Sequence, residues 1–209
     1  MPERLKRWEA ALMVGLAVAL LAGASLEGEH SQLAQRVIRL HVIANSDSAA
    51  DQQLKLQVRD RVLDCAAALY EPEDDVQTAT QRLRGSLDLL EQVGEQTVRE
   101  QGYAYPVQVT LGKHTFPTKR YTDFSLPAGE YTALRVVIGR GEGENWWCVA
   151  FPPLCLGSVT ETVEQAAQAG HFTDGQVSLI TGESQGYVFK FKAMELWQAV
   201  KAACGRLSI

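Results

Sequence analysis

The chain has 209 residues, of which 46% are hydrophobic, and its formal net charge is −5 at pH 7. This length permits one domain of ordinary size or at most two small ones. The acidic balance argues against a nucleic-acid-binding protein, because such a protein needs a basic face that displaces counterions from phosphates. We therefore expect no nucleic-acid partner.

The N-terminus has the pattern of an export signal. Three basic residues precede an apolar run over residues 10–24, which ends in the small residues Ala22-Gly23-Ala24. A basic flank, a short apolar run and a small-residue cleavage site are typical of a secretory signal. The run is shorter than the ~20 residues that a membrane-spanning helix needs. We predict a signal peptide or an uncleaved membrane segment over residues 1–30, with the rest of the chain exported.

The first predicted strand covers residues Val37 to Ala44, in which side chains alternate in kind along the chain. Arg39 and His41 fall on one face of this strand. We expect His41 to be a partly exposed strand residue rather than a metal ligand or a catalytic base. The opposite, apolar face consists of Ile38, Leu40, Val42 and Ala44.

Two helices are predicted next. Asn45-Ser46-Asp47-Ser48 offers side-chain oxygens that cap a helix N-terminus, and the helix that follows ends before Pro72. A longer helix begins at Asp74-Asp75, whose charges suit the positive end of a helix, and stops at Gly102. Two consecutive amphipathic helices predict a helical hairpin on a sheet. The apolar stripe of the first helix comprises Leu54, Val58, Val62, Cys65 and Leu69.

Residues 107–121 predict a strand and its return. Alternating apolar residues over 107–111 predict a strand that enters a turn at Gly112-Lys113. We expect residues 114–121 to come back as the partner strand.

Residues 116–155 contain two further predicted strands. Residues 134–138 alternate, and the continuous bulky run over 146–151 predicts a second strand. The loop between them, residues 139–145, has three glycines, which allow positive φ and a hairpin reversal. Pro152-Pro153 should end the second strand, because neither residue can donate a backbone hydrogen bond.

The C-terminal part completes the predicted fold. It contains a helix over 159–169, a β-hairpin of 177–181 with 187–192, and a final helix over 193–203. We therefore predict a single α+β domain over residues 31–209, with an antiparallel-rich sheet, a helical hairpin and a C-terminal helix.

Four cysteines suit an exported chain, because disulfides form outside the cytoplasm. We predict a disulfide between Cys148 and Cys155, whose short loop is restricted by Pro152-Pro153; two separately buried thiols are the alternative. Pairing of Cys65 with Cys204 is a weaker prediction, because buried free cysteine is common. Close Cys-His spacing is missing, so we expect no metal and no cofactor.

One pattern in the sequence suggests a serine hydrolase. Residues 182–186 read GESQG and match the nucleophile-elbow motif, in which a strand precedes the serine and a helix follows it. Here a predicted strand follows, and neither His nor Asp occurs after Ser184. We interpret the motif as a turn.

Two other patterns are also unconvincing as catalytic or phosphate sites. The glycine loop lacks the Lys-Ser/Thr of a P-loop and carries Glu142 and Glu144, which repel an anion. Cys148 could act as a nucleophile with His41 or His114 as base, but a disulfide would block it. We expect no catalytic residue.

A recognition surface on residues 116–155 is the remaining hypothesis. Adjacent strand residues point to opposite faces, so one of Trp146 and Trp147 should pack in the core while the other meets solvent or a partner. Aromatic and basic side chains commonly anchor protein interfaces. The alternative is that these side chains only build the core. The candidate partner-binding residues are Phe116, Pro117, Lys119, Tyr121, Trp146, Trp147, Pro152 and Pro153.

Five motifs stand out between about Arg36 and Cys155. They are LHVIANSDS at 40–48, FPTK at 116–119, LPAGEYTALRV at 126–136, GRGEGENWWCV at 139–149 and FPPLC at 151–155. Together they closely resemble the motifs of the stage II sporulation protein R family.

The resemblance implies a secreted signalling protein of endospore formation. Such a protein is made in the forespore and exported into the space between the two membranes. There it triggers a membrane-embedded aspartic protease that processes the precursor of sigma-E. We expect the chain to act as a ligand, with membrane contact only through its N-terminal segment before any cleavage. An exported hydrolase of cell wall or peptide and a wall-associated structural module are the alternatives.

Overall fold

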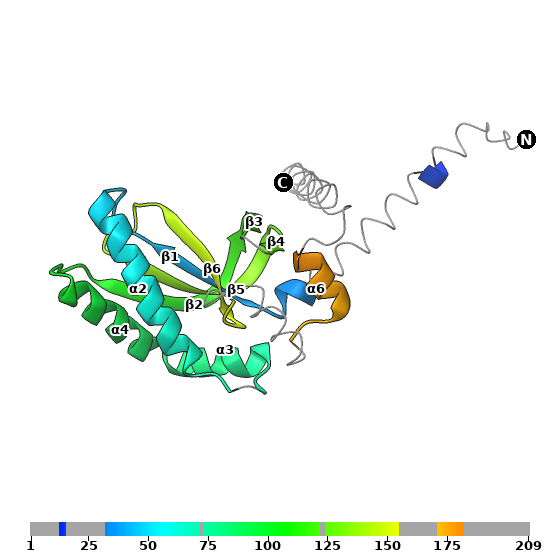
Figure 1. Ribbon diagram of the computed structural model, residues 1–209, viewed down its shortest axis with the longest axis horizontal. Coiled ribbons are helices and arrows are strands. Elements are labelled where there is room, and N and C mark those ends of the chain that lie inside the picture. Colours follow the sequence, from blue (N-terminus) through cyan, green and yellow to red (C-terminus); the bar gives the residue numbers. More distant parts are fainter. Residues whose placement is uncertain (1–12, 16–31, 72, 122–123, 155–170, 182–209) are drawn as a thin grey trace, which may run out of the picture. The chain divides into compact units, whose positions relative to one another are not determined.

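The computed structural model describes residues 13–15, 32–71, 73–121, 124–154 and 171–181 (Figure 1). The chain divides into two units, one formed by residues 34–185 and the other by 1–33 with 186–209. The first unit is described below. Within the described ranges, no helix combines the length and apolarity needed to cross a bilayer. The segment predicted as a signal lies almost entirely outside these ranges and stays a prediction.

The first unit is an α+β fold around a mixed, mostly antiparallel four-stranded sheet. The strand order is β2-β5-β1-β6, in which β1 runs parallel to β5 and antiparallel to β6, while β2 is antiparallel to β5. A separate two-stranded sheet consists of β3 (Lys119–Arg120) and β4 (Ser125–Leu126). The strands of the main sheet are β1 (Ile38–Ile43), β2 (Val107–Phe116), β5 (Gly129–Ile138) and β6 (Asn145–Phe151).

The central strand β1 is buried along its whole length. Its apolar face enters the main core, as predicted. Arg39 and His41, on the other face, are also buried, with 0% and 8% of their surfaces exposed. The prediction of a partly exposed His41 is therefore wrong, because aromatic side chains from β2 and β6 cover this face of the sheet.

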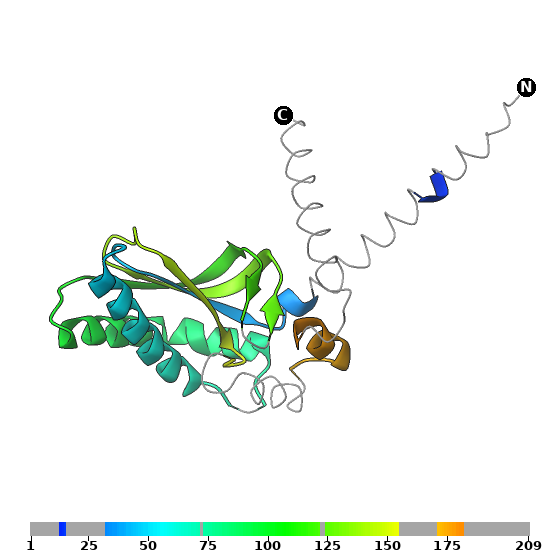
Figure 2. The same ribbon diagram turned by 45° about the horizontal axis from the view of Figure 1, so that its top comes forward.

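Helices cover the opposite face (Figures 1 and 2). Helix α2 (Ala49–Ala67) begins at Ser48, whose side chain accepts a hydrogen bond from the Asp51 amide, as the capping cluster predicted. It lies beside helix α4 (Leu87–Glu100), which also packs on β2. Leucine and valine side chains from both helices form one core with the sheet.

The long helix predicted between Asp74 and Gly102 is interrupted. Helix α3 (Val76–Gly85) ends at Ser86, whose φ of −120° and ψ of 13° are not helical, and α4 starts at the next residue. The predicted ends are confirmed: Asp75 caps α3 by accepting from the Thr78 amide, and Gly102 adopts a φ of 81° after α4.

The turn predicted at Gly112-Lys113 is wrong. Strand β2 continues through both residues, which pair with Ala133 and Thr132 of β5. Gly112 is not among the glycines with positive φ, so the backbone stays extended there. The reversal comes later, after Phe116, and β3 and β4 lie within it.

The hairpin predicted between β5 and β6 is also wrong, although both strands form as expected. Strand β1 lies between them, so the loop of residues 139–144 crosses one strand before β6 begins. Gly139 and Gly141 do have positive φ, at 59° and 65°. Strand β6 ends at Phe151, before Pro152-Pro153, as predicted.

Residues 177–181 were predicted as a strand, but they belong to helix α6 (Asp174–Thr181). Thr173 and Gln176 form reciprocal bonds at its start: the Gln176 side-chain oxygen accepts from the Thr173 amide at 3.0 Å, and the Thr173 hydroxyl accepts from the Gln176 amide at 3.4 Å. The GESQG motif therefore follows a helix. The motif itself and the elements predicted over 159–169, 187–192 and 193–203 lie outside the described residues.

Candidate functional site

Two segments far apart in sequence are hydrogen-bonded to each other at one end of the sheet. We call residues 44–51 together with the loop 139–144 the latch. The Gly143 amide donates to the Ala44 carbonyl at 3.0 Å, and the Arg140 amide donates to Asn45 Oδ1 at 3.0 Å. The Glu144 amide donates to Asp47 Oδ1 at 2.7 Å. The loop that leads into β6 is thus fixed at three successive points.

Asp51 is the polar centre of the latch, and only 4% of its surface is exposed. Its carboxylate accepts from Ser46 Oγ at 2.5 Å and from Asn45 Nδ2 at 2.9 Å. These hydrogen bonds, that from Ser46 first, hold the pKa of Asp51 below its usual range. The carboxylate thus stabilises the latch in its ionised form.

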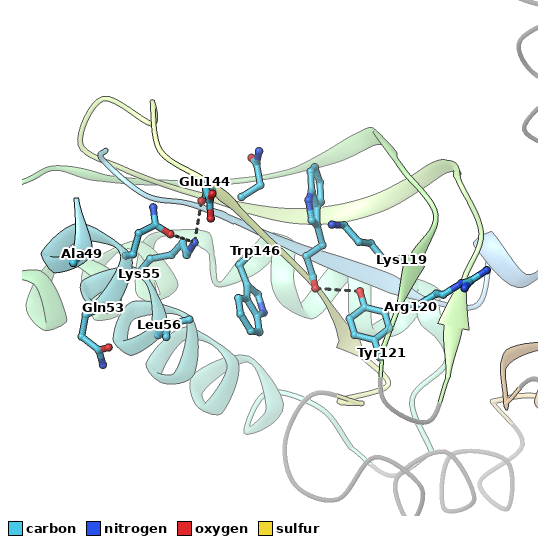
Figure 3. A pocket seen from close by; sticks show the side chains of 12 residues that line it. Ala49, Gln53, Lys55, Leu56, Lys119, Arg120, Tyr121, Glu144 and Trp146 are labelled. Atoms are coloured by element: carbon cyan, nitrogen blue, oxygen red, sulfur yellow. Dashed lines mark hydrogen bonds between the residues drawn. The ribbon is translucent and has the colours of Figure 1, made fainter. Parts of the chain in front are cut away.

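A groove of about 660 Å³ opens next to the latch. Figure 3 shows α2 on one side, the β3 segment on the other, and the first residues of β6 between them. Twelve residues line it: Ala49, Gln52, Gln53, Lys55, Leu56, Lys119, Arg120, Tyr121, Glu144, Asn145, Trp146 and Trp147. Its volume lies within the range of about 300–1,000 Å³ that is typical of ligand sites.

The side of the groove next to α2 combines one aromatic ring with two cations. The Trp146 side chain is 37% exposed, and the Arg59 guanidinium lies 4.4 Å from its ring centre. Lys55 is buried and donates from Nζ to the Glu144 carbonyl at 3.0 Å and to Gln52 Oε1 (Figure 3). Burial lowers the pKa of Lys55, against the opposing effect of the Glu144 and Asp47 charges.

Trp147 points to the opposite face of the sheet, as the period-2 rule predicted. Its indole stacks on the His41 ring at 3.8 Å, with 17° between the planes, and meets Phe116 edge-on at 4.8 Å. His41 Nε2 is hydrogen-bonded with Asn145 Oδ1 at 2.5 Å. Burial lowers the pKa of His41, so its neutral form is favoured. Trp147 is half-buried and Trp146 exposed.

A buried arginine fixes the β3 side of the groove. Arg39 donates from Nε to the Cys148 carbonyl at 3.0 Å and from Nη2 to the Tyr121 hydroxyl at 3.1 Å. Its guanidinium lies over the ring of Phe116 at 4.4 Å. The Tyr121 hydroxyl in turn donates to the Trp147 carbonyl at 3.1 Å (Figure 3). Tyr121 therefore connects the β3 segment to β6.

Sequence reasoning missed this role of Arg39. Its sign was a charged residue within a predicted strand whose other residues are mostly apolar, in a chain whose aromatic residues gather in the segment 116–155. A guanidinium can remain buried when aromatic faces and oxygen acceptors replace its hydration. Sequence reasoning also missed Lys55 and Arg59, because they lie on a helix far from residues 116–155.

The groove brings together four of the eight candidate partner-binding residues: Lys119, Tyr121, Trp146 and Trp147. The other four lie elsewhere. Phe116 is 0% exposed, and its ring makes an edge contact with the Trp147 indole. Pro117 is exposed but does not line the groove, while Pro152 is buried and Pro153 half-buried after the far end of β6.

The cysteines do not form an exposed reactive pair in the described structure. Cys148 is disulfide-bonded, but its predicted partner Cys155 lies outside the described residues, so their pairing stays a prediction. Cys65 is free, and Cys204 also lies outside the described residues. Cys148 pairs with Leu40 and shares its core face, opposite to His41. Among the described residues, no cluster of His, Cys, Asp or Glu has the size of a metal site.

The comparisons with known proteins converge on one family. The family model for stage II sporulation protein R matches residues 34–161, a range that contains the latch and the whole groove. Stage II sporulation protein R of Bacillus subtilis (strain 168) is 38% identical over 144 residues, which is 69% of this chain and 64% of the relative. No solved structure shows a significant match. The match spans more than half of the chain, and the chain therefore belongs to the stage II sporulation protein R family.

Proposed function

We propose that this chain is an exported signal of endospore formation, which binds and activates a membrane-embedded aspartic protease that processes the precursor of sigma-E. Family membership supports a role in sporulation. The finer assignment combines the expectations from the family resemblance with the export pattern of residues 1–30. In this proposal the forespore secretes the chain into the space between the two membranes.

The observation that carries the proposal is the groove. It gathers aromatic and basic side chains from α2, β3 and β6 onto one accessible surface. Side chains of these types commonly anchor protein interfaces. The latch and the Arg39–Tyr121 contact hold both sides of the groove in place, which lowers the conformational cost of binding.

The titratable groups beneath this surface already have structural contacts. The Asp51 carboxylate accepts hydrogen bonds inside the latch, and His41 stacks on Trp147 while bonded with Asn145. These contacts favour a ligand over a hydrolase. The chain would activate the protease by binding its active conformation more tightly than its inactive one.

The test is reconstitution in a bacterium that forms no spores. The full-length chain, the protease and the sigma-E precursor are produced together, and processing is followed by immunoblotting. Processing is expected only when all three are present. A chain that lacks residues 1–30 serves as the export control and should give none. Processing without this chain, or its absence when all three are produced and the chain is exported, would overturn the proposal.

A further inference from the structure

We propose that the outer edge of β6 binds an extended, acidic segment of the partner, which adds to the sheet as a further strand. This inference relies on the proposed function for the identity of the partner, but the binding site and its chemistry come from the groove. Strand addition to a sheet edge is an established mode of peptide recognition, because the backbone of the edge strand supplies the hydrogen bonds.

The first observation is the direction of the β6 backbone. Strand β6 is at the end of the strand order and pairs with β1. Two carbonyls of β6 accept from side chains: that of Trp147 from the Tyr121 hydroxyl, and that of Cys148 from Arg39 Nε. In an antiparallel pair the backbone groups of alternate residues point toward the partner strand and away from it, so half of the backbone groups of β6 point away from β1. The groove therefore exposes a template for strand pairing.

The second observation is the charge of the surface. Lys119 and Arg120 form no ion pair within the described part of the chain, although both line the groove. Arg59 lies over Trp146 on the other side, where it is ion-paired with Asp60. Glu144 is the one acidic residue in the lining. This basic surface on a chain of net charge −5 favours an acidic occupant.

The two faces of β6 then predict the pattern of the bound segment. Side chains of an added strand alternate between the two faces of the sheet. On one face they would meet Trp146 and Leu56 of α2, and on the other they would meet Trp147 and Lys119. A segment in which apolar residues alternate with Asp or Glu fits both faces: its apolar side chains would contact Trp146 and Leu56, and its carboxylates would lie near Lys119.

The direct test measures binding of synthetic peptides to the full-length chain by tryptophan fluorescence and calorimetry. The probe is a ten-residue peptide of alternating Glu and Val. Controls are the Lys-Val peptide and two Glu-Val peptides that are N-methylated at the odd or at the even positions, which blocks pairing from one edge. We expect saturable binding of the Glu-Val probe, and binding at least about tenfold weaker for the Lys-Val peptide and for one or both methylated peptides.

Two results would overturn the inference at this stage. Equal binding of all the Glu-Val peptides would mean that charge alone acts, without strand pairing. Absence of saturable binding of the Glu-Val probe, or equal binding of the Lys-Val peptide, would remove the acidic segment as occupant. A concentration-dependent dimer that the Glu-Val probe does not dissociate would assign the edge to a second copy of the chain instead.

Charge reversal locates the site. Lys119→Glu combined with Arg120→Glu should weaken binding of the Glu-Val probe by about tenfold, because two cations that line the groove are replaced by repelling charges. Lys113→Glu is the matched control, since Lys113 is exposed on β2 at the opposite edge of the sheet, and it should change binding less than about twofold. Equal effects of the two variants would contradict a site at β6.

The same variants in the processing assay separate this inference from the proposed function. Loss of processing by the double reversal, with Lys113→Glu active, supports both. Normal processing by the double reversal overturns the groove as the partner's site and leaves protease activation intact. If the unaltered, exported chain gives no processing although it binds the probe, the proposed function fails while the peptide site remains.

Discussion

The segment 139–147 contributes residues 139–144 to the latch and residues 144–147 to the groove, but the two regions differ in how their polar groups are satisfied. In the latch, amides and side chains bond with one another, as in the contact of Arg140 N with Asn45 Oδ1 at 3.0 Å. In the groove, Lys119 and Arg120 form no ion pair among the described residues, and Trp146 is 37% exposed. One continuous motif, GRGEGENWW, thus serves two purposes: its first half fixes the loop and its second half forms a surface.

This difference predicts that substitutions in the latch act on stability, whereas substitutions in the groove act on binding. The largest stability effect is expected at Gly143. A Cβ there would lie 2.3 Å from the Ser46 carbonyl oxygen, which belongs to the backbone and cannot rotate away. Gly143→Ala should therefore lower the free energy of unfolding by about 3 kcal/mol in urea denaturation.

Gly85 provides the matched control for this substitution. It lies in α3, and a Cβ there would meet nothing within 4 Å. Gly85→Ala should change the free energy of unfolding by less than about 1 kcal/mol. If the two alanine variants were equally stable, the close approach of the two latch segments would not exist in solution.

Asp51→Asn should have the next largest effect, about 2 kcal/mol at pH 7, because the uncharged amide oxygen accepts from Ser46 and Asn45 more weakly than the ionised carboxylate oxygen does. The pKa of Asp51 is lowered in the folded chain. Its contribution is therefore present above the pKa of the unfolded chain and is lost as pH falls through the folded pKa. Urea denaturation should show the variant and the unaltered chain converging at low pH. A gap that is constant with pH would contradict this account.

Protonation of His41 should also lower the free energy of unfolding as the pH falls, but by less than protonation of Asp51. Burial lowers its pKa below 6.5, with Asn145 opposing the shift and the charges of Arg135 and His114 adding to it. The unfolded chain therefore takes up the proton first, and stability falls as pH drops below 6.5. His41→Phe keeps an aromatic ring against Trp147 but removes the titration. Its stability should fall less between pH 7 and pH 5 than that of the unaltered chain, which denaturation at both pH values would measure.

The sequence predicted local structure better than long-range order. Alternation identified β1 and β5, a continuous bulky run identified β6, and the capping residues located the start of α2. The position of β1 between β5 and β6 could not be predicted from the glycines of the loop, because positive φ suits a hairpin and a loop that crosses one strand equally well. Strand order is determined by contacts between distant segments, and a local pattern does not contain them.

The candidate site was predictable to a similar extent. Period-2 alternation placed Trp146 and Trp147 on opposite faces of β6, which the structure confirms. It could not show that Phe116 is buried, because its burial depends on Arg39 and Trp147 from two other strands. The contribution of α2 to the groove was missed for the same reason.

The two tryptophans provide the sharpest comparison between structure and function. Trp147→Ala should lower the free energy of unfolding by about 2 kcal/mol, because the half-buried indole packs on His41 and Phe116. Trp146→Ala should lower it by less than about 1 kcal/mol, since the side chain is exposed and its main described contact is with Arg59.

In the processing assay Trp146→Ala should reduce activity by about tenfold or more although the chain stays folded, because an exposed aromatic anchor in a groove contributes to binding rather than to folding. The fold of the variant is checked by circular dichroism and urea denaturation. Full processing by Trp146→Ala would mean that the partner binds outside the groove. Unfolding of the same variant would mean that the exposed tryptophan belongs to the core after all, and the distinction between latch and groove would then fail.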